Sequence, residues 1–421
     1  MLGPAAMNMS PNSTEAPVRV AYLVSQYPML SMIFIIREVL QLRQLGFEID
    51  VASINRADRG REALTEAEAG EAARTYYVIP HGVRGALAAH ARAIFGRPAA
   101  YCRGLFVALR LGRSDLRRLV MNLIYFTEAL MVGAWMQRSR QTHLHVHLGQ
   151  QVATVGMFVK QVFGFGLSIT VHGPDEFYDA QGQYLEQKVA AADFICCISF
   201  FARSQLMKQS AHEHWSKLVV ARLGVDPSLF VPSRAAAPDG VFEILCVGRL
   251  TPAKGQHLLV EALSALLKSG RAARLRIVGD GVDRRSLEAL VAGRELGAAV
   301  VFEGAVNQDR IRSLYARADC FCIPSFAEGI PVVLMEAMAM EIACVTTHIT
   351  GIPELIRHGV EGLLVAPSDL DGLVDALAQL IDDPELRRRL GEAGRRRVVA
   401  QYSLSDNVDT LAGIFKQRIA T

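Results

Sequence analysis

Residues 320–338 read CFCIPSFAEGIPVVLMEAM, and this stretch is the most informative one about the fold. Cys320–Ile323 is a short apolar run typical of a buried strand, and Pro331 suits the first position of a helix, where the amide needs no partner. The strand would therefore deliver a loop to a helix N-terminus. Free amides and the helix dipole there attract anions, so the stretch predicts an anion-binding loop in an α/β sheet.

Two carboxylates belong to this predicted loop and helix. Glu328 stands beside Gly329, where a ligand could approach the backbone closely, and Glu336 follows eight residues after Glu328, inside the helix. Glu336 is surrounded by apolar residues, and a buried carboxylate needs a polar partner. We expect Glu328 to contact a ligand at the helix mouth and Glu336 to reach a polyol further along. The alternative is one surface glutamate and one helix-face glutamate.

Strand and helix patterns alternate along the whole chain, which predicts parallel βαβ units with helices on both faces of each sheet. In the first half, strands are expected at 18–24, 49–53, 76–79, 144–148, 167–171, 194–198 and 218–221. In the second half they are expected at 243–247, 274–278, 300–302, 320–323, 343–346 and 362–365. This pattern predicts two α/β domains, with a ligand cleft between them at the carboxyl ends of strands.

The domain boundaries follow from composition. Residues 226–240 hold three prolines and show no periodicity, so they are expected to form a linker. Residues 1–17 have neither a basic start nor a long apolar run, and we expect a flexible leader rather than an export signal. The predicted domains are 18–225 and 241–400, followed by a C-terminal helix at 401–421 that packs back on the N-terminal domain.

The overall composition excludes several classes of protein. Apolar residues make up 51% and charged residues 21%, so the chain can bury two cores and is not disordered. The net charge of +3 gives no reason to expect nucleic acid as a partner. The seven cysteines are scattered and contain no CxxC pair, which is typical of a reducing cytosol rather than of a disulfide framework or a zinc ribbon.

A second informative stretch, residues 246–255, reads CVGRLTPAKG. Gly248 ends a predicted strand, and Arg249 and Lys254 flank a proline-bearing loop that opens the next helix. Two cations at the end of a strand facing a cleft suit a diphosphate, because arginine offers a fork of donors and lysine a point charge. The alternative is two solvated cations.

Together, Gly-Arg-Leu-x-x-x-Lys-Gly at 248–255 and Glu-Gly-x-Pro-x-x-x-x-Glu at 328–336 resemble the donor half of the retaining family 4 glycosyltransferases. These enzymes have the GT-B fold, two Rossmann-like doubly wound α/β domains facing across a cleft, and the resemblance runs from residue 18 to the C-terminus. It implies that Arg249 and Lys254 bind the diphosphate of a nucleotide sugar, that Glu336 takes the ribose hydroxyls, and that Glu328 with the following amides holds the sugar. The donor-binding residues implied are Gly248, Arg249, Lys254, Gly281, Val306, Glu328, Gly329, Ile330, Val332 and Glu336.

The first half resembles the exopolysaccharide and colanic-acid type of these enzymes. The matching segments are Ser-Gln-Tyr-Pro at 25–28, Arg37-Glu38, Val-His-Gly-Pro-Asp-Glu-Phe at 171–177 and Leu-Gly-Val-Asp at 223–226. The resemblance implies that His172 contacts the transferred sugar, although it could instead only cap a loop, and that Tyr27 and Asp175 lie on the acceptor side. Where the family usually has Ser-Glu-Thr-Phe, this chain has Ser-Met-Ile-Phe at 31–34, so Met32-Ile33 replaces a polar acceptor-side pair.

Two other kinds of site are disfavoured. His143, His145 and His147 alternate on one side of a predicted strand, as metal ligands would, but no carboxylate accompanies them locally. Similar enzymes carry a His-x-His strand without a metal, and no metal site is predicted. Gly279-Asp280-Gly281 begins like the dinucleotide fingerprint, but Arg284 stands in place of the third glycine, which disfavours a dehydrogenase.

Residues 84–118 carry a net charge of +7, from eight arginines and one aspartate, with apolar residues between them. This pattern is typical of basic amphipathic helices on an anionic membrane surface, and the alternative is an arginine-rich solvated face. The apolar stretch 119–136 contains Asn122, Thr127 and Glu128, so a buried or interfacial helix is expected there rather than a transmembrane one.

The resemblance thus implies a cytoplasmic hexosyltransferase that moves a hexose from a UDP- or GDP-sugar to a glycan or polyprenyl-linked acceptor in bacterial exopolysaccharide biosynthesis. Retention of configuration, independence of metal ions and the absence of any cofactor are implied as well, with His172, Arg249, Lys254 and Glu328 as catalytic residues. Membrane contact through residues 84–118 is expected. The alternatives are a nucleotide-sugar epimerase of the same fold and a non-catalytic member of a polysaccharide assembly complex, which the Met32-Ile33 departure favours.

Overall fold

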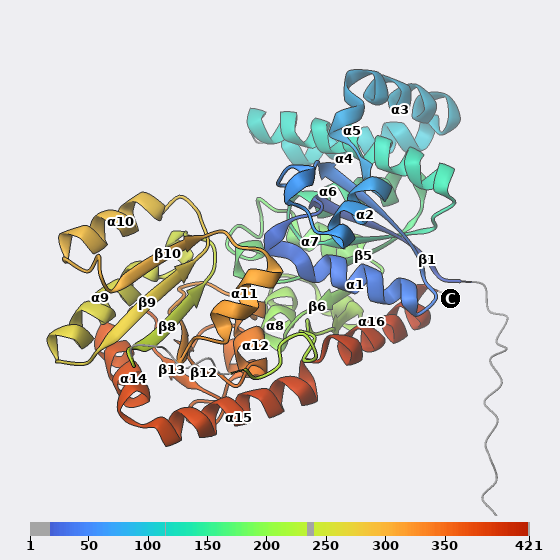
Figure 1. Cartoon of the computed structure of the whole chain (residues 1–421). Helices are drawn as coiled ribbons and strands as arrows, with labels where there is room; N and C mark the ends of the chain where they lie inside the picture. The colour runs from blue at the N-terminus through green and yellow to red at the C-terminus, as the bar shows by residue number, and fades with distance from the viewer. Residues whose placement is uncertain (1–16, 114, 234–239, 420–421) are drawn as a thin grey trace, which may run out of the picture.

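The computed structural model describes residues 17–113, 115–233 and 240–419, which form two α/β domains, each built on one sheet (Figure 1). Nearly all of the predicted leader and the middle of the predicted linker lie outside the described residues. Every strand expected from the apolar runs is present, with each end within two residues of its predicted place. The prediction of two parallel α/β domains is confirmed.

The N-terminal sheet has the strand order β3-β2-β1-β4-β5-β6-β7, and its described pairs are parallel. The order reverses between β1 and β4, and such switch points are where doubly wound sheets bind ligands, at the carboxyl ends of the strands. The strands are β1 (Arg19–Gln26), β2 (Glu48–Asn55), β3 (Tyr76–Tyr77), β4 (His143–His147), β5 (Gly166–Val171), β6 (Phe194–Cys197) and β7 (Leu218–Val220).

The C-terminal sheet has the order β10-β9-β8-β11-β12-β13 and is also parallel throughout its described pairs. Its switch point lies between β8 and β11, so the loops that follow these two strands are neighbours. The strands are β8 (Phe242–Val247), β9 (Ala273–Val278), β10 (Val300–Gly304), β11 (Cys320–Ile323), β12 (Ala343–Thr347) and β13 (Leu363–Val365).

Helices cover both sheets. Those of the N-terminal domain are α1 (Ile33–Gln44), α2 (Glu66–Arg74), α3 (Gly82–Gly96), α4 (Pro98–Gly112), α5 (Leu116–Ser139), α6 (Gln151–Phe163), α7 (Leu185–Ala191) and α8 (Phe200–Lys208). The C-terminal half has α9 (Gln256–Lys268), α10 (Arg284–Gly293), α11 (Gln308–Tyr315), α12 (Val332–Ala339), α13 (Ile352–Leu355), α14 (Leu370–Asp382), α15 (Pro384–Gln401) and α16 (Leu404–Ile419).

The last helix returns to the N-terminal domain. Figure 1 shows α16, in red, beside α1, in blue, and the Phe415 ring packs against Phe47, Phe194 and His145 with centroids 5.0–6.2 Å apart. A second tie comes from Glu354 on α13, whose carboxylate accepts hydrogen bonds from the amides of Phe200 and Phe201 at the start of α8. Both contacts join the two domains across their boundary.

Helices α3, α4 and α5 form an outer layer at one end of the N-terminal domain (Figure 1). Among the described residues, α5 is the one helix long and apolar enough to cross a membrane by composition, but 56% of its most apolar window is buried. It packs against α3, α4 and α6. This packing is what the sequence predicted, because Asn122 interrupts the apolar stretch. The buried Asn122 amide donates to the Tyr184 hydroxyl at 2.9 Å.

Candidate active site

The loop between β11 and α12 carries a buried carboxylate paired with a lysine from the neighbouring loop. Glu328 is 7% exposed, and its Oε1 accepts hydrogen bonds from Ser325 Oγ at 2.7 Å and Lys254 Nζ at 2.5 Å. The two loops meet because β8 and β11 are adjacent, and the Phe326 amide donates to the Ala253 carbonyl at 2.8 Å. The structure thus brings together two residues that lie 74 positions apart in the sequence.

Arg249 and Lys254 differ in exposure and in ion pairing, which the sequence did not show. Lys254 is half-buried and already shares its charge with Glu328. Arg249 is exposed and forms no ion pair with the described residues, so its guanidinium is available to an anion. Pro331 also differs slightly from its predicted place, since it precedes the first helical residue of α12 with extended backbone angles (φ −68°, ψ 123°). The helix N-terminus still follows Glu328 directly.

Three glycine-bearing loops lie side by side next to this pair. The Gly248 amide donates to Val278, the Leu250 amide to Asp280 and the Gly279 amide to Gly304, at 2.8–3.0 Å. Gly279 has a φ of +132°, and a Cβ there would lie 2.0 Å from the Gly248 carbonyl oxygen. A Cβ on Gly281 would lie 2.3 Å from the Leu250 oxygen. These glycines are therefore required for loop packing itself, and Val306 follows the third loop, half-buried.

Glu336 is buried as predicted and has two polar partners. It is 4% exposed, its Oε2 accepts a hydrogen bond from the Tyr315 hydroxyl at 3.1 Å, and its Oε1 lies 3.8 Å from a guanidinium nitrogen of Arg37. Burial raises the pKa of Glu336 to about 7, although the charge of Arg37 and the Tyr315 hydrogen bond act in the opposite direction. Because Arg37 belongs to α1, this contact crosses the cleft between the domains.

The two domains touch directly at the predicted site. A Cβ on Gly329 would lie 2.1 Å from the His172 carbonyl oxygen, and one on Gly173 would lie 3.3 Å from the Gly329 amide nitrogen. Only a residue without a side chain fits at 329 in this arrangement. The loop after β5 and the loop before α12 therefore face each other.

The loop after β5 is held by a buried glutamate that sequence analysis did not single out. The Glu176 carboxylate accepts hydrogen bonds from the amides of Gly149, His172 and Gly173. Lys188 is also buried, donates to the carbonyls of Gly149 and Gln150, and has its pKa lowered to about 7 by burial. Because Glu176 caps this loop, the His172 side chain does not have that task.

The His172 ring instead joins a row of buried side chains. It packs against Phe34 with centroids 5.2 Å apart, and its Nε2 lies 3.1 Å from Nδ1 of His147. His147 Nε2 lies 3.0 Å from Glu38 Oε1, which also accepts a hydrogen bond from the Tyr22 hydroxyl at 2.7 Å. Burial, followed by the proximity of His147, holds the pKa of His172 well below its usual range.

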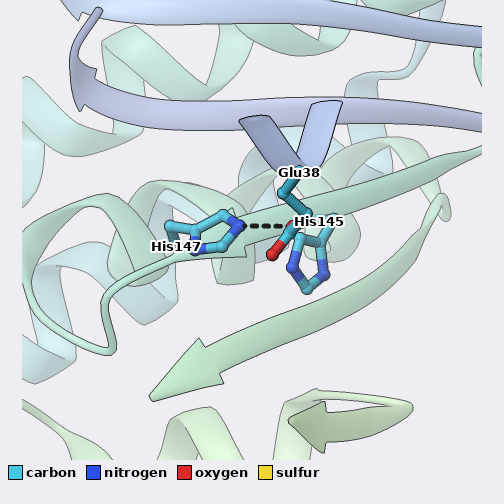
Figure 2. A group of neighbouring side chains, drawn as sticks. All are labelled: Glu38, His145 and His147. Atoms are coloured by element: carbon cyan, nitrogen blue, oxygen red, sulfur yellow. Dashed lines mark hydrogen bonds and ion pairs between the residues drawn. The ribbon is translucent and has the colours of Figure 1, made fainter. Parts of the chain in front are cut away.

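No carboxylate stands near the strand histidines in the sequence, but the fold brings one to them. Glu38 arrives from α1, 109 positions before His147, and places a ligand-type atom within 4.8 Å of those of His145 and His147 (Figure 2). However, His145 Nδ1 is hydrogen-bonded to Ser168 at 2.8 Å and its Nε2 to Thr170 at 2.9 Å. With both His145 nitrogens occupied, the cluster suits a hydrogen-bond network better than a metal ion.

The acceptor-side predictions have different outcomes. Asp175 is exposed in the short 3-10 helix 174–176 that follows His172 and Gly173. Tyr27 is only 1% exposed, and its hydroxyl donates to Glu71 at 2.9 Å, because the loop after β1 folds inward over α2. The Tyr27 side chain is therefore not presented to the cleft in this structure. Met32 and Ile33 are half-buried against the core around α1.

Residues 232–397 match the family Glycosyl transferases group 1. Over 384 residues, the chain is 28% identical to the putative colanic acid biosynthesis glycosyltransferase WcaL of Escherichia coli K12, covering 88% of this chain and 92% of that protein. It is 26% identical to the amylovoran biosynthesis glycosyltransferase AmsK of Erwinia amylovora, with 86% and 90% covered. Anabaena HepE, solved in complex with UDP, superposes with a TM-score of 0.70 at 16% identity, covering 95% of this chain and all of that one.

Proposed function

We propose that this chain is a group 1 glycosyltransferase that transfers a hexose from a UDP- or GDP-sugar to a glycan acceptor during exopolysaccharide biosynthesis. The match of residues 232–397 to that family and the GT-B fold support this proposal. The observation that carries the proposal is the Lys254–Glu328 pair, held by two adjacent loops at the N-terminus of α12 and facing His172 across the domain boundary. A positive and a negative side chain, Lys254 and Glu328, thus lie together at the place where a sugar diphosphate would have to react.

The donor would lie across the C-terminal half of this site. Arg249 and Lys254 would hold the diphosphate, and together with the amides that open α12 they would stabilise the negative charge that grows on the leaving group. Glu328 and the backbone at Gly329, Ile330 and Val332 would hold the sugar. Glu336 would accept the ribose hydroxyls, and Gly248, Gly281 and Val306 would form the surrounding wall.

The Lys254–Glu328 contact suggests how the site is prepared for its donor. In the absence of a ligand, each charge offsets the other, so neither is left buried and unpaired. An arriving diphosphate can take over Lys254 while the sugar hydroxyls take over Glu328. Both side chains are then already within reach of their partners, and little reorganisation is required at the moment of reaction.

Metal independence and retention of configuration are part of the proposal. Two cations and a helix N-terminus can supply the charge stabilisation that a divalent ion gives in other transferases. Full activity in EDTA is expected, and an absolute requirement for a divalent ion would contradict this part. The anomeric proton of the first product, followed by NMR before mutarotation, is expected to show the configuration of the donor sugar; the opposite anomer would exclude retention.

Membrane contact through α3–α5 is proposed because this face combines cations with exposed apolar side chains. Phe95 is 86% exposed and Leu116 76% exposed. The exposed arginines on these helices and in the connection between α4 and α5 are Arg84, Arg92, Arg103, Arg110, Arg113, Arg117 and Arg118. Such a face suits an anionic inner leaflet, where each cation near the surface contributes about 1 kcal/mol. A polyprenyl-linked acceptor would be reached from that surface by an enzyme on the cytoplasmic side.

The test is a transfer assay with labelled UDP- and GDP-sugars and a polyprenyl-diphosphate-linked glycan presented in vesicles. Label moving into the lipid fraction with one donor supports the proposal and identifies the base. Isomerised sugar formed from the donor alone would indicate an epimerase instead. Neither transfer nor nucleotide binding would indicate the non-catalytic alternative, for which the half-buried Met32 and Ile33 remain the supporting observation.

A further inference from the structure

A continuous chain of hydrogen bonds runs from the interior of the N-terminal domain to the residue that faces the donor loop. It starts at the Tyr22 hydroxyl, passes through the Glu38 carboxylate and His147, and ends at His172, with separations of 2.7, 3.0 and 3.1 Å. Figure 2 shows Glu38 and His147 joined directly, with the His145 ring beside them. These groups come from β1, α1, β4 and the loop after β5, so the fold assembles them from distant parts of the sequence.

The chemistry of the donors and acceptors determines which atom carries the hydrogen in each of these hydrogen bonds. A carboxylate can only accept hydrogen bonds, so the Tyr22 hydroxyl and His147 Nε2–H both donate to Glu38. A neutral His147 that carries its proton on Nε2 has a bare Nδ1, which can only accept. His172 Nε2 must then carry the hydrogen that fills the 3.1 Å gap to His147 Nδ1.

One consequence concerns the other nitrogen of His172. Burial favours the uncharged form of this ring, and an uncharged imidazole protonated on Nε2 has no hydrogen on Nδ1. Nδ1 forms no hydrogen bond with the described residues, and His172 is half-buried rather than enclosed. This nitrogen is therefore left as a hydrogen-bond acceptor on a residue whose backbone carbonyl lies against Gly329 of the donor loop.

We propose that Glu38 and His147 are positioning residues that hold His172 in the tautomer with a bare Nδ1, so that it accepts a hydrogen bond from a hydroxyl of the transferred sugar or of the acceptor. This inference rests on the proposed function of the cleft. Neither positioning residue touches the substrate. They act by setting which ring nitrogen of His172 carries the proton and by fixing the ring against Phe34.

The neighbouring possibilities predict the opposite tautomer, which makes the proposal testable. If a metal ion were bound at Glu38 and His147 Nε2, His147 would carry its proton on Nδ1 and donate to His172 Nε2. A doubly protonated His147 would do the same. In both cases His172 would carry its hydrogen on Nδ1 and would offer a donor, not an acceptor, to the cleft.

The first test reads the tautomer without any substrate. In protein labelled with ¹⁵N-histidine, long-range proton–nitrogen correlation spectra distinguish Nδ1-protonated from Nε2-protonated rings, and His172→Gln identifies the His172 signals. We expect His172 to be protonated on Nε2 with a bare Nδ1, before and after treatment with a chelator. Protonation on Nδ1, or a switch caused by the chelator, would overturn the proposal.

The second test removes the hydrogen bonds between Glu38, His147 and His172, and it follows the His172 tautomer and the rate of transfer in the same variants. The double variant His147→Phe with Glu38→Gln leaves no unpaired buried carboxylate. In this variant His172 is expected to lose its fixed tautomer. We expect kcat/KM to fall about 10- to 100-fold, as when a partner that orients a histidine is removed. Glu38→Ala should lose more activity than Glu38→Gln, because the amide oxygen of glutamine can still accept from His147. Equal losses in these two variants would contradict positioning by Glu38.

His143→Phe is the matched control. His143 lies on the same strand and the same buried face, stacks on Phe194 and bonds Ser168, but it does not contact His147 or His172. It should lower stability without changing the His172 tautomer or the ratio of kcat to KM. If the expected tautomer is found but the protein uses no donor, the proposed function is wrong and the positioning of His172 by Glu38 and His147 is still supported. If transfer occurs and the tautomer is reversed, only the positioning of His172 is wrong.

Discussion

The two halves of the candidate site are built by different means. The C-terminal half consists of loops that bond to one another through backbone groups, and Gly279, Gly281 and Gly329 leave no space for a Cβ. The N-terminal half consists of a hydrogen-bonded row of side chains that runs from the buried Tyr22, Glu38 and His147 to the half-buried His172. The first half offers charges and amides to a ligand, and the second presents one neutral ring.

This difference explains why the C-terminal half of the site could be predicted from the sequence more fully than the N-terminal half. A backbone-built site leaves short local motifs, because the glycines, the prolines and the charged residues of one loop are neighbours in the chain. A row of side chains leaves no such motif, since Glu38 and His147 are 109 positions apart. Variants that change one half and leave the other intact therefore separate the contributions of the two halves.

Lys254→Ala should give the largest effect, a loss of about 10²–10³ in kcat, the scale of removing one preorganised charge contact to the developing anion. Because Glu328 would lose its partner, Lys254→Ala with Glu328→Gln should restore stability but not turnover. Steady-state kinetics with the preferred donor measure this, and exposed Lys268→Ala on α9 serves as a control. Near wild-type turnover in Lys254→Ala would remove Lys254 from the site.

Gly329→Ala should break the contact between the halves, because its Cβ would lie 2.1 Å from the His172 carbonyl oxygen. A displacement of about 1 Å at a reacting centre costs about 10²-fold in rate, and we expect a loss of this order in kcat/KM. Gly413→Ala on α16, where no atom lies within 4 Å, controls for the substitution itself. Equal activity of these two variants would show that the loops need not touch during the reaction.

Glu336→Gln should change the pH dependence of stability. The pKa of Glu336 is raised from its usual range to about 7 in the folded protein, so the folded state holds the proton more tightly than the unfolded chain does. Its contribution to stability is therefore present at low pH and is lost as the pH rises from about 4.5 to about 7. Relative to wild type, the variant should gain on the order of 3 kcal/mol between pH 4.5 and 8.

Urea unfolding of both proteins at several pH values measures this difference. Parallel stability curves for wild type and Glu336→Gln would mean that Glu336 is ionised throughout this range. In that case Arg37, 3.8 Å away across the cleft, would be a stronger partner than its geometry indicates.

The smallest effect on chemistry is expected outside both halves, on α3. Phe95→Ser with Leu87→Ser should weaken binding to vesicles containing anionic lipid by about tenfold per side chain, since a fully buried apolar side chain contributes about 1.5–3 kcal/mol. Transfer to a water-soluble acceptor should be unaffected. Val399→Ser on α15 is the matched control, and unchanged vesicle binding in the double variant would contradict membrane contact through this face.

Much of the fold could be predicted because parallel strands are buried on both faces and appear as short apolar runs. The loops with Lys254 and Glu328 could be placed together because adjacent parallel strands bring their carboxyl ends to one edge. Glu336 was expected to need a partner, but Tyr315 and Arg37 could not be named, since Arg37 arrives from the other domain. The burial of the Tyr27 side chain could not be predicted, because its motif does not show which way the loop after β1 folds.

Glu176 and Lys188 were missed for a similar reason. Both are charged residues that the sequence pattern would assign to the surface, yet both are buried and satisfied by backbone groups of the loops after β4 and β5. Glu176 stood in the Asp-Glu of the segment 171–177, but only the three-dimensional arrangement shows that it caps the loop.

The most direct measurement is the thermal shift of the whole protein with UDP, GDP, their sugar conjugates and NAD, in wild type and in Arg249→Ala. Arg249 is exposed and has no ion-pair partner among the described residues, so its truncation should not disturb the fold. A ligand at a hundred times its Kd stabilises by about 2.7 kcal/mol. A shift with one nucleotide family that shrinks in the variant is expected. The absence of a shift with every nucleotide, or a shift that the variant leaves unchanged, would contradict a donor site at this cleft.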